Sequence, residues 1–330
     1  MNQSDRFSVS RRSALAGALG LLATGAGAQS GGYPNRPVKL LVPTPAGGGA
    51  DALARLVATR LAVQMKQPFV VENRPGAAGV AVGEAVTHMA PDGYNLLIGA
   101  IAFLGVAPSL YKSLPYDPIR DFTAISGGVL LSNVLVVNPS LPVNNVRELI
   151  ALAKAKPGTI AFSSAGNATA GHLAGELFAR MTGTQLTHVP YRGGGPAMTD
   201  LMAGVVQISF ASPPSALPLV RAGRLRAIAV TTEKRLAAMP ELPTVAEAGV
   251  PGFVANNWYC FVGPAGMPAD IVARLNREIR AVMMDPAIAP TLANEGMTPD
   301  PSTPEQLTAF IQSEIRKWGE VVRAANIQPS

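Results

Sequence analysis

Apolar runs of two kinds alternate along the first third of the chain. Val38–Val42 is short, apolar and β-favouring, whereas the residues from Leu53 to Leu61 place apolar side chains at helical spacing. The same order returns as a strand at 69–72, a helix at 80–89 and a strand at 96–98. Such repeats predict a parallel sheet with helices on both faces.

A second series follows a long apolar run at 122–137 that contains Gly127-Gly128. We interpret this run as a crossing between two domains, in which glycines can absorb the rotation of a hinge. Beyond it we predict strands at 159–162, 186–189, 206–211 and 225–230, a return strand at 256–263, and helices at 146–155, 170–181, 217–222, 270–284, 286–295 and 303–325, with one more helix ending at Ala203.

The return strand predicts that one domain interrupts the other. The expected fold class is α/β, with two domains at 34–128 plus 257–330 and at 129–256. Each is expected to hold a mainly parallel sheet flanked by helices, and crossover strands join them. Ligands of open α/β sheets bind outside the carboxyl ends of the strands. Two such edges on either side of a hinge would form a closing cleft.

A glycine-rich loop at 43–49 separates the first strand from its helix. Bare backbone N–H groups at a helix N-terminus attract anions, and Asp51 in the first turn suits the helix dipole. Three interpretations remain open: a carboxylate site, a tight turn, or a pyrophosphate site. The last uses the loose G-x-G-x-x-A spacing that ends at Ala52, with Glu72 as the acid for a ribose, in a dinucleotide-dependent enzyme.

Two small polar loops, at 163–169 and at 190–196, each precede a further helix. Arg192 in the second loop is a candidate partner for a carboxylate, because a guanidinium fork fits that group; a salt bridge is the alternative. Ser163 or Ser164 would be the nucleophile if the protein were an exported hydrolase. The neighbouring residues do not form a G-x-S-x-G elbow, so hydrogen-bonding hydroxyls are the simpler interpretation.

The N-terminus carries the pattern of a secretory signal peptide. Three arginines precede an apolar run at 14–23, and the small residues Gly25–Ala28 follow it. The run is too short to span a bilayer, so we predict cleavage near Ala28 and a periplasmic location. Either general or twin-arginine export fits the pattern. Export argues against a nicotinamide cofactor, which is scarce outside the cytoplasm.

Charge and cysteine content narrow the classes further. The net charge of +6 suits small anionic ligands, and no Lys/Arg cluster interleaved with aromatic residues points to nucleic acid. The single cysteine, Cys260, allows no intramolecular disulfide. His88 and His188 lack the spacing of metal ligands, so neither a metal nor a cofactor is expected.

Five motifs resemble the Bug family of periplasmic solute-binding proteins, the receptor type of tripartite tricarboxylate transporters. They are Val42–Asp51, Glu72–Ala77, Ala90–Tyr94, Val189–Gly194 and Leu242–Glu247, and the resemblance covers nearly all of the mature chain. It implies a monomeric, non-catalytic Venus-flytrap protein that closes on a small organic carboxylate and serves integral-membrane transporter subunits. In this family, backbone groups and ordered waters largely hold the carboxylate.

The resemblance also implies a set of ligand-binding residues. The first-domain side would comprise Thr44, Ala46, Gly47, Gly48, Gly49 and Asp51, and the second-domain side Ser163, Ser164, Gly166, Asn167, Thr169, His172, Tyr191, Arg192, Gly193 and Ser212. A packed, neutral histidine is the alternative for His172. The family often has Thr at position 50 and Asp at position 211, where this chain has alanines. Loss of a cleft acid favours a plain or aromatic carboxylate over an amino acid.

Overall fold

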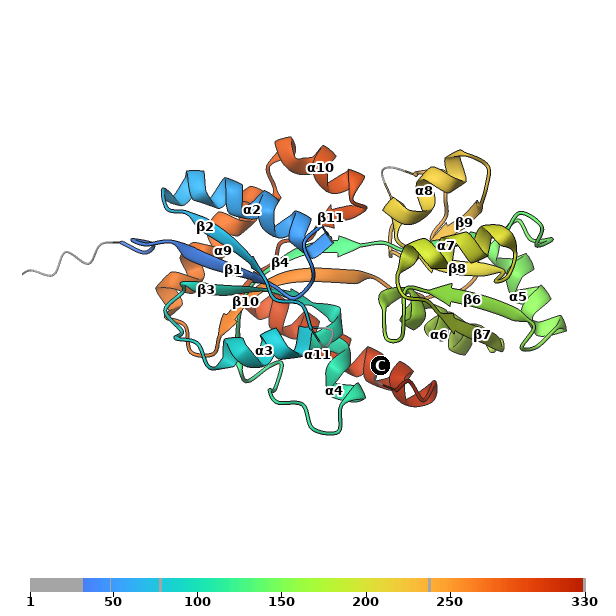
Figure 1. Cartoon of the computed structure of the whole chain (residues 1–330), viewed down its shortest axis with the longest axis horizontal. Coiled ribbons are helices and arrows are strands. Elements are labelled where there is room, and N and C mark those ends of the chain that lie inside the picture. Colours follow the sequence, from blue (N-terminus) through green and yellow to red (C-terminus); the bar gives the residue numbers. More distant parts are fainter. Residues whose placement is uncertain (1–31, 48, 77–78, 237–238, 329–330) are drawn as a thin grey trace, which may run out of the picture. The chain divides into compact units, whose positions relative to one another are not determined.

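The computed structural model describes residues 32–47, 49–76, 79–236 and 239–328 (Figure 1). The predicted signal peptide and Gly48 lie outside these residues. The sheets and helices belong to the unit that begins at Arg36. None of the helices in the described ranges combines the length and the apolar character needed to cross a membrane.

The first sheet has six strands in the order β11-β4-β10-β3-β1-β2. Their bounds are β1 Val38–Val42, β2 Phe69–Asn73, β3 Asn95–Ala100, β4 Phe122–Leu131, β10 Asn257–Pro264 and β11 Met297–Pro299. β1 pairs in parallel with β2 and β3, whereas β10 runs antiparallel to both β3 and β4. The predicted return strand is therefore a central strand of the sheet.

The second sheet has five strands in the order β7-β6-β8-β5-β9. They are β5 Val134–Val137, β6 Ile160–Ser164, β7 Leu186–Pro190, β8 Ile208–Ala211 and β9 Arg226–Val230. β6 is parallel to β7 and β8, and β5 is antiparallel to β8 and β9. The two-sheet α/β class is confirmed. The sheets are mixed rather than mainly parallel, because the crossover strands β4, β10 and β5 run against their neighbours.

The helices follow the predicted order with shifted ends. They are α2 Gly49–Met65, α3 Val80–Thr87, α4 Ala107–Leu110, α5 Val146–Ala155, α6 Ala170–Thr182, α7 Gly194–Ala203, α8 Pro213–Arg221, α9 Ala269–Met283, α10 Ala289–Asn294 and α11 Pro304–Ala324, with short turns η2 Ala102–Val106 and η3 Pro286–Ile288. The elements η2, α4 and β11 were not predicted. α8 begins four residues earlier than expected because Pro213 and Pro214 occupy its first turn, where proline is tolerated.

The apolar run predicted as one crossing divides into β4 and β5, with Ser132-Asn133 between them. Gly127 and Gly128 lie within β4 and allow close packing: an added Cβ would lie 2.3 Å from the carbonyl oxygen of Asp300 at the first and 2.8 Å from that of Tyr259 at the second. Close packing therefore explains why these two positions hold glycine. The domain division at 34–128 plus 257–330 and at 129–256 stays a prediction.

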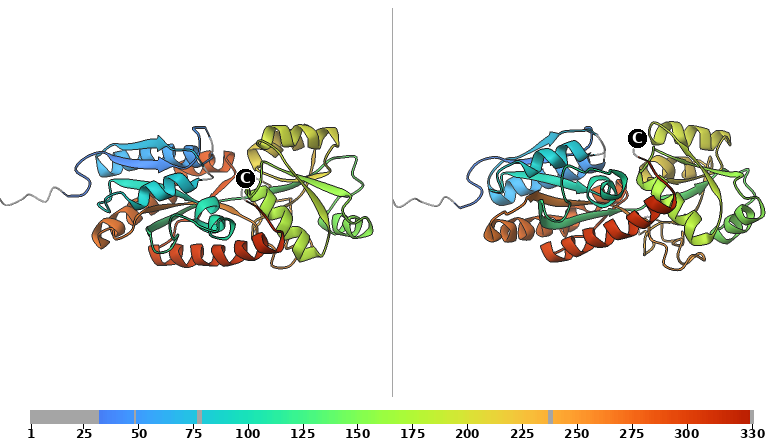
Figure 2. Two further views of the ribbon diagram at one scale, coloured as in Figure 1. Left: turned by 60° about the horizontal axis from the view of Figure 1, so that its bottom comes forward. Right: turned by 90° about the horizontal axis from the view of Figure 1, so that it is seen from below.

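α11 packs against η2, β4 and α6 (Figure 2). A shared carboxylate anchors it: Glu314 Oε2 accepts hydrogen bonds from the indole nitrogens of Trp258 and Trp318, both 2.8 Å away. Lys317 forms an ion pair with the same carboxylate. Because both indoles are buried and satisfied, β10 and the C-terminal helix are held together by a polar contact inside the core.

Candidate functional site

A cavity of about 180 Å³ opens at one edge of the second sheet. This edge holds the carboxyl ends of β6 and β8 and the first residues of β5, since β5 runs in the opposite direction. The lining residues are Asn133, Ser164, Ala165, Thr169, Ala170, Gly171, Gly194, Ala197, Met198, Ser209, Phe210, Ala211, Ser212, Ser215 and Asn257. Each water occupies about 30 Å³ of liquid, so the cavity accommodates a small organic molecule.

Three helices begin beside this cavity. Thr169, Gly193 and Ser212 occupy the N-cap positions of α6, α7 and α8, and none of them caps its helix through a side chain. Gly171 brings α6 close to β8, since an added Cβ would lie 2.6 Å from the carbonyl oxygen of Phe210. The helix starts therefore direct N–H groups and the positive ends of their dipoles toward one place.

Asn133 is a buried polar residue among those that line the cavity. Its side chain is 6% exposed, and Nδ2 has no partner within the described part of the chain. Its backbone is fixed, because its N–H donates to Thr231 Oγ1 at 2.9 Å and its carbonyl accepts from the Thr231 N–H at 3.0 Å. A buried donor without a partner carries a free-energy cost in the folded protein.

Ser164 and two histidines form a packed group next to the cavity. Ser164 Oγ lies 2.7 Å from His188 Nε2 and 2.9 Å from the carbonyl oxygen of Gly166. The rings of His188 and His172 stack with centroids 3.7 Å apart. Burial, and secondarily His172, lowers the pKa of His188 to about 4. His188 is therefore a weak base, and Ser164 is only 2% exposed; this geometry suits loop support better than nucleophilic catalysis.

Asp51 braces the loop between β1 and α2. Asp51 Oδ2 accepts from the Gly47 N–H and from Arg55 Nε, each at 2.9 Å, and Oδ1 accepts from Asn73 Nδ2 at 2.9 Å. The hydrogen bond from Arg55 is the main cause that lowers the pKa of Asp51 to about 2. Asp51 thus holds the loop. Thr44 Oγ1, in contrast, is a buried hydroxyl with no partner among the described residues.

Glu72, the acid expected to bind the ribose of a dinucleotide, already forms ion pairs with two basic side chains. Glu72 Oε2 lies 3.3 Å from Lys39 Nζ, and Oε1 lies 2.6 Å from Arg74 Nη2. The hydrogen bond from Arg74 lowers the pKa of Glu72. The engaged carboxylate of Glu72 does not favour a dinucleotide at this loop.

The cavity gathers only part of the predicted binding set. Ser164, Thr169 and Ser212 line it, and Gly193 directly precedes the lining residue Gly194. The other predicted residues on this side, which do not line it, are Ser163, Gly166, Asn167, His172, Tyr191 and Arg192. Thr44, Ala46 and Gly47 lie on the loop after β1, Gly49 and Asp51 lie in the first turn of α2, and none of the five lines the cavity.

The burial and hydrogen bonds of individual residues explain why some of the predicted residues do not line the cavity. Ser163 is fully buried, and its carbonyl accepts from Ser209 Oγ at 3.0 Å. The Tyr191 hydroxyl donates to Asp200 Oδ2 at 2.7 Å, whereas Arg192 is exposed.

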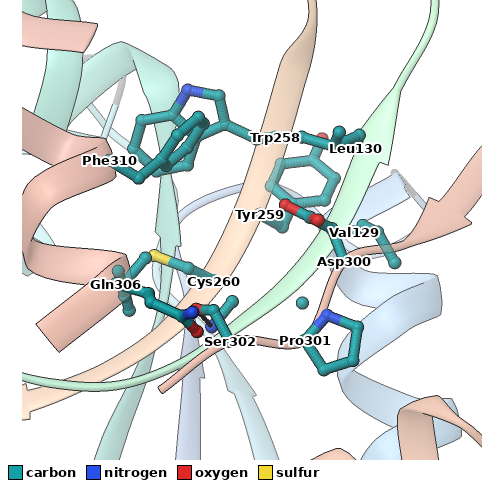
Figure 3. A pocket seen from close by; sticks show the side chains of 13 residues that line it. Val129, Leu130, Trp258, Tyr259, Cys260, Asp300, Pro301, Ser302, Gln306 and Phe310 are labelled. Atoms are coloured by element: carbon teal, nitrogen blue, oxygen red, sulfur yellow. Dashed lines mark hydrogen bonds between the residues drawn. The ribbon is translucent and has the colours of Figure 1, made fainter. Parts of the chain in front are cut away.

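A second cavity, of about 400 Å³, lies where β4 and β10 meet the segment before α11 (Figure 3). Trp258, Tyr259, Asp300 and Phe310 are among its lining residues. The indole nitrogen of Trp258 donates a hydrogen bond to Glu314, and its ring packs edge-on against Phe310. Within the described ranges, no group of three His, Cys, Asp or Glu residues is placed to hold a metal ion.

Comparisons with known proteins agree with this architecture. Residues 53–327 match the family model of the tripartite tricarboxylate transporter family receptor. Protein BugT of Bordetella pertussis is 41% identical over 294 residues, which cover 88% of this chain and 90% of BugT. A UPF0065 protein of a Pseudomonas species, encoded in the tcbD-tcbE intergenic region, is 35% identical over 96% of this chain and 95% of its own length.

Two solved structures with ligands are similar over nearly the same span. R. palustris Rpa4515 with adipate has a TM-score of 0.78 and 36% sequence identity, covering 90% of this chain and 100% of that one. MatC from Rhodopseudomonas palustris with bound malate has a TM-score of 0.73 and 30% identity, covering 88% of this chain and 100% of that one.

Proposed function

Because this chain belongs to the tripartite tricarboxylate transporter receptor family, we propose that it is a periplasmic solute-binding protein for a small organic carboxylate. It captures the ligand without catalysis and delivers it to integral-membrane subunits of a tripartite transporter. The related structures with adipate and malate support this ligand class.

The observation that carries the proposal is the composition of the cavity at the second sheet. Three helix starts without side-chain caps surround this space. Helix N-termini present backbone hydrogen-bond donors and positive dipole ends, so the cavity offers what a carboxylate needs.

Hinge closure is the second part of the proposal. The loop of the first sheet, with Thr44, Ala46, Gly47 and Gly49, would approach the ligand from the opposite side. The free hydroxyl of Thr44 and the bound carboxylate of Asp51 support a preformed loop that awaits a partner. The signal peptide, with cleavage near Ala28, would bring the chain to the periplasm.

A thermal-shift screen of residues 29–330 tests this function. We expect one group of carboxylates to raise the melting temperature, because a ligand that binds only the native state stabilises it by mass action. The matched amides should give no shift, since they lack the charge that the helix starts attract. A shift with nucleotides and none with any acid would contradict the proposal.

A further inference from the structure

Ala168, in the loop between β6 and α6, adopts a backbone conformation that alanine seldom takes. Its φ is 57°, in the left-handed region, where the Cβ of an L-residue crowds the backbone. Residues 169–171 follow directly as the N-cap and the first two residues of α6, and all three line the cavity. The direction in which α6 begins therefore depends on a conformation that alanine needs support to keep.

The ring of His172 provides this support. The Ala168 N–H donates to His172 Nδ1 at 3.0 Å, so Nδ1 carries no proton. The other ring nitrogen, Nε2, lies 3.5 Å from Glu176 Oε1, a carboxylate oxygen that can only accept. Both contacts select the same ring orientation and the same tautomer, a neutral imidazole with its proton on Nε2.

His188 holds the other end of the same loop. Its Nε2 lies 2.7 Å from the Oγ of Ser164, the last residue of β6. The His188 ring stacks on that of His172, with 3.7 Å between the centroids and 6° between the planes. Burial lowers the pKa of His188 to about 4, so this ring is neutral at pH 7 and stacks without charge repulsion. The two rings therefore tie both ends of the loop to one packed group.

We propose that His172 is a positioning residue of the carboxylate site: by accepting the Ala168 N–H, it sets the direction from which the first N–H groups of α6 meet the ligand. The assignment rests on the proposed function and takes the place of a direct contact between His172 and the ligand. The side chain is 5% exposed and does not line the cavity, so it acts through the loop. The first N–H groups of a helix have no partner within it, and a carboxylate binds them well only at a fixed distance and angle.

Two substitutions of His172 separate positioning from simple packing. Leucine fills a similar space but accepts no hydrogen bond, whereas the Oδ1 of asparagine is an acceptor attached to Cγ, as Nδ1 is in histidine. If His172 only filled the core, the leucine variant would keep more ligand affinity than the asparagine variant. Because the loop needs an acceptor at this place, we expect the opposite order.

Calorimetric titration with succinate, glutarate and adipate measures this order. For the acid that binds the wild type best, we expect His172→Leu to weaken binding by about 10-fold, and His172→Asn by about 3-fold or less, since it keeps the hydrogen bond. Adding Ala168→Gly to His172→Leu should recover about 3-fold, because glycine adopts a positive φ without the crowding of a Cβ.

Thr182→Val is the control for a helix weakened at its other end. Thr182 is the last residue of α6, its Oγ1 donates to the carbonyl oxygen of Phe178 at 2.6 Å, and it does not line the cavity. This variant should lower the melting temperature and leave the ligand affinity unchanged. A loss of affinity equal to that of His172→Leu would mean that stability alone controls binding, which overturns the positioning role.

Nitrogen NMR of the wild-type protein without ligand provides a second readout, which does not depend on whether His172→Leu folds. We expect an unprotonated Nδ1 and a protonated Nε2 in His172, and an Ala168 amide that exchanges slowly with solvent. A proton on Nδ1 overturns the inference, because the Ala168 N–H would then have no acceptor.

The outcomes separate the inference from the proposed function. Affinity that is equal in His172→Leu and His172→Asn, or no recovery with Ala168→Gly, overturns the role of His172 and leaves the carboxylate receptor intact. Failure of every acid to bind the wild type overturns the proposed function and this role with it.

Discussion

At the edge of the first sheet, the loop between β1 and α2 uses the carboxylate of Asp51 to bind its own backbone, Arg55 and Asn73. At the edge of the second sheet, the loops before α6, α7 and α8 leave the helix starts without side-chain caps, and Asn133 keeps a free amide nitrogen. Both edges follow the same local plan of strand, small-residue loop and helix.

The difference shows that this plan does not define a binding site by itself. An acid in the first helical turn can engage a backbone N–H of the preceding loop and fix that loop, as Asp51 does with Gly47. No acid lies in the first turn of α6, α7 or α8. The carboxylate of Asp51 therefore distinguishes a loop that is braced by its own helix from loops that are not.

The largest expected effect comes from removing that acid. Asp51→Ala should lower the free energy of unfolding by about 3 kcal/mol, because several hydrogen bonds to a buried carboxylate are lost together. Urea denaturation measures the change, with Glu320→Ala as the control for an exposed carboxylate. If both variants lose the same stability, Asp51 does not support the loop as described.

A methyl group at the second edge should have the next largest effect. Gly171→Ala places a Cβ 2.6 Å from the Phe210 carbonyl oxygen, so α6 must shift away from β8. We expect a loss of about 1–3 kcal/mol and weaker carboxylate binding. Gly195→Ala is the matched control, because its Cβ would meet nothing within 4 Å and Ala favours the helix. Calorimetry and melting curves of both variants would sharpen the comparison.

Mild acid should lower the stability of the folded protein through His188, which lies in β7 of the second sheet. Its pKa is about 4 in the folded protein against 6.5 for the ordinary side chain. As pH falls from 6.5 to about 4, the unfolded chain takes up a proton that the folded protein refuses, so stability decreases across this window.

His188→Gln should lose less stability than the wild type between pH 7 and pH about 4, because it removes this proton uptake. Urea denaturation over a pH series measures the difference. His88→Gln, at an exposed position, should follow the wild type. Parallel pH profiles for wild type and His188→Gln would show that folding does not lower the pKa of His188.

The smallest effect is expected at the contact between α6 and α11. Arg180 and Glu320 form an ion pair at 3.2 Å, with side chains 47% and 60% exposed. Arg180→Ala should change the unfolding free energy by about 0.5 kcal/mol or less, and high salt should abolish the difference. A loss comparable to that of Asp51→Ala would mean that this contact, rather than the loop network, supports the molecule.

Local sequence signals predicted those elements whose ends are marked by residues within or beside them. α5 was predicted at its observed limits from the helical pattern of Val146–Ala155 and from Pro157-Gly158, which follows it; the structure adds that Asn145 caps it. β11 was missed because three residues form a strand only through pairing with β4. Likewise, the sequence indicates the small residues at the start of α6, but the free amide of Asn133 depends on neighbours that only the fold assembles.

The position of β10 between β3 and β4 has a consequence for biosynthesis. β1 to β4 leave the ribosome early, yet they form one sheet only after residues 257–264 have been made. The second sheet is continuous from Val134 to Val230 and needs no later segment for its strands to pair. Because closing a long loop costs chain entropy before its contacts form, we expect the second sheet to complete its strand pairing before the first.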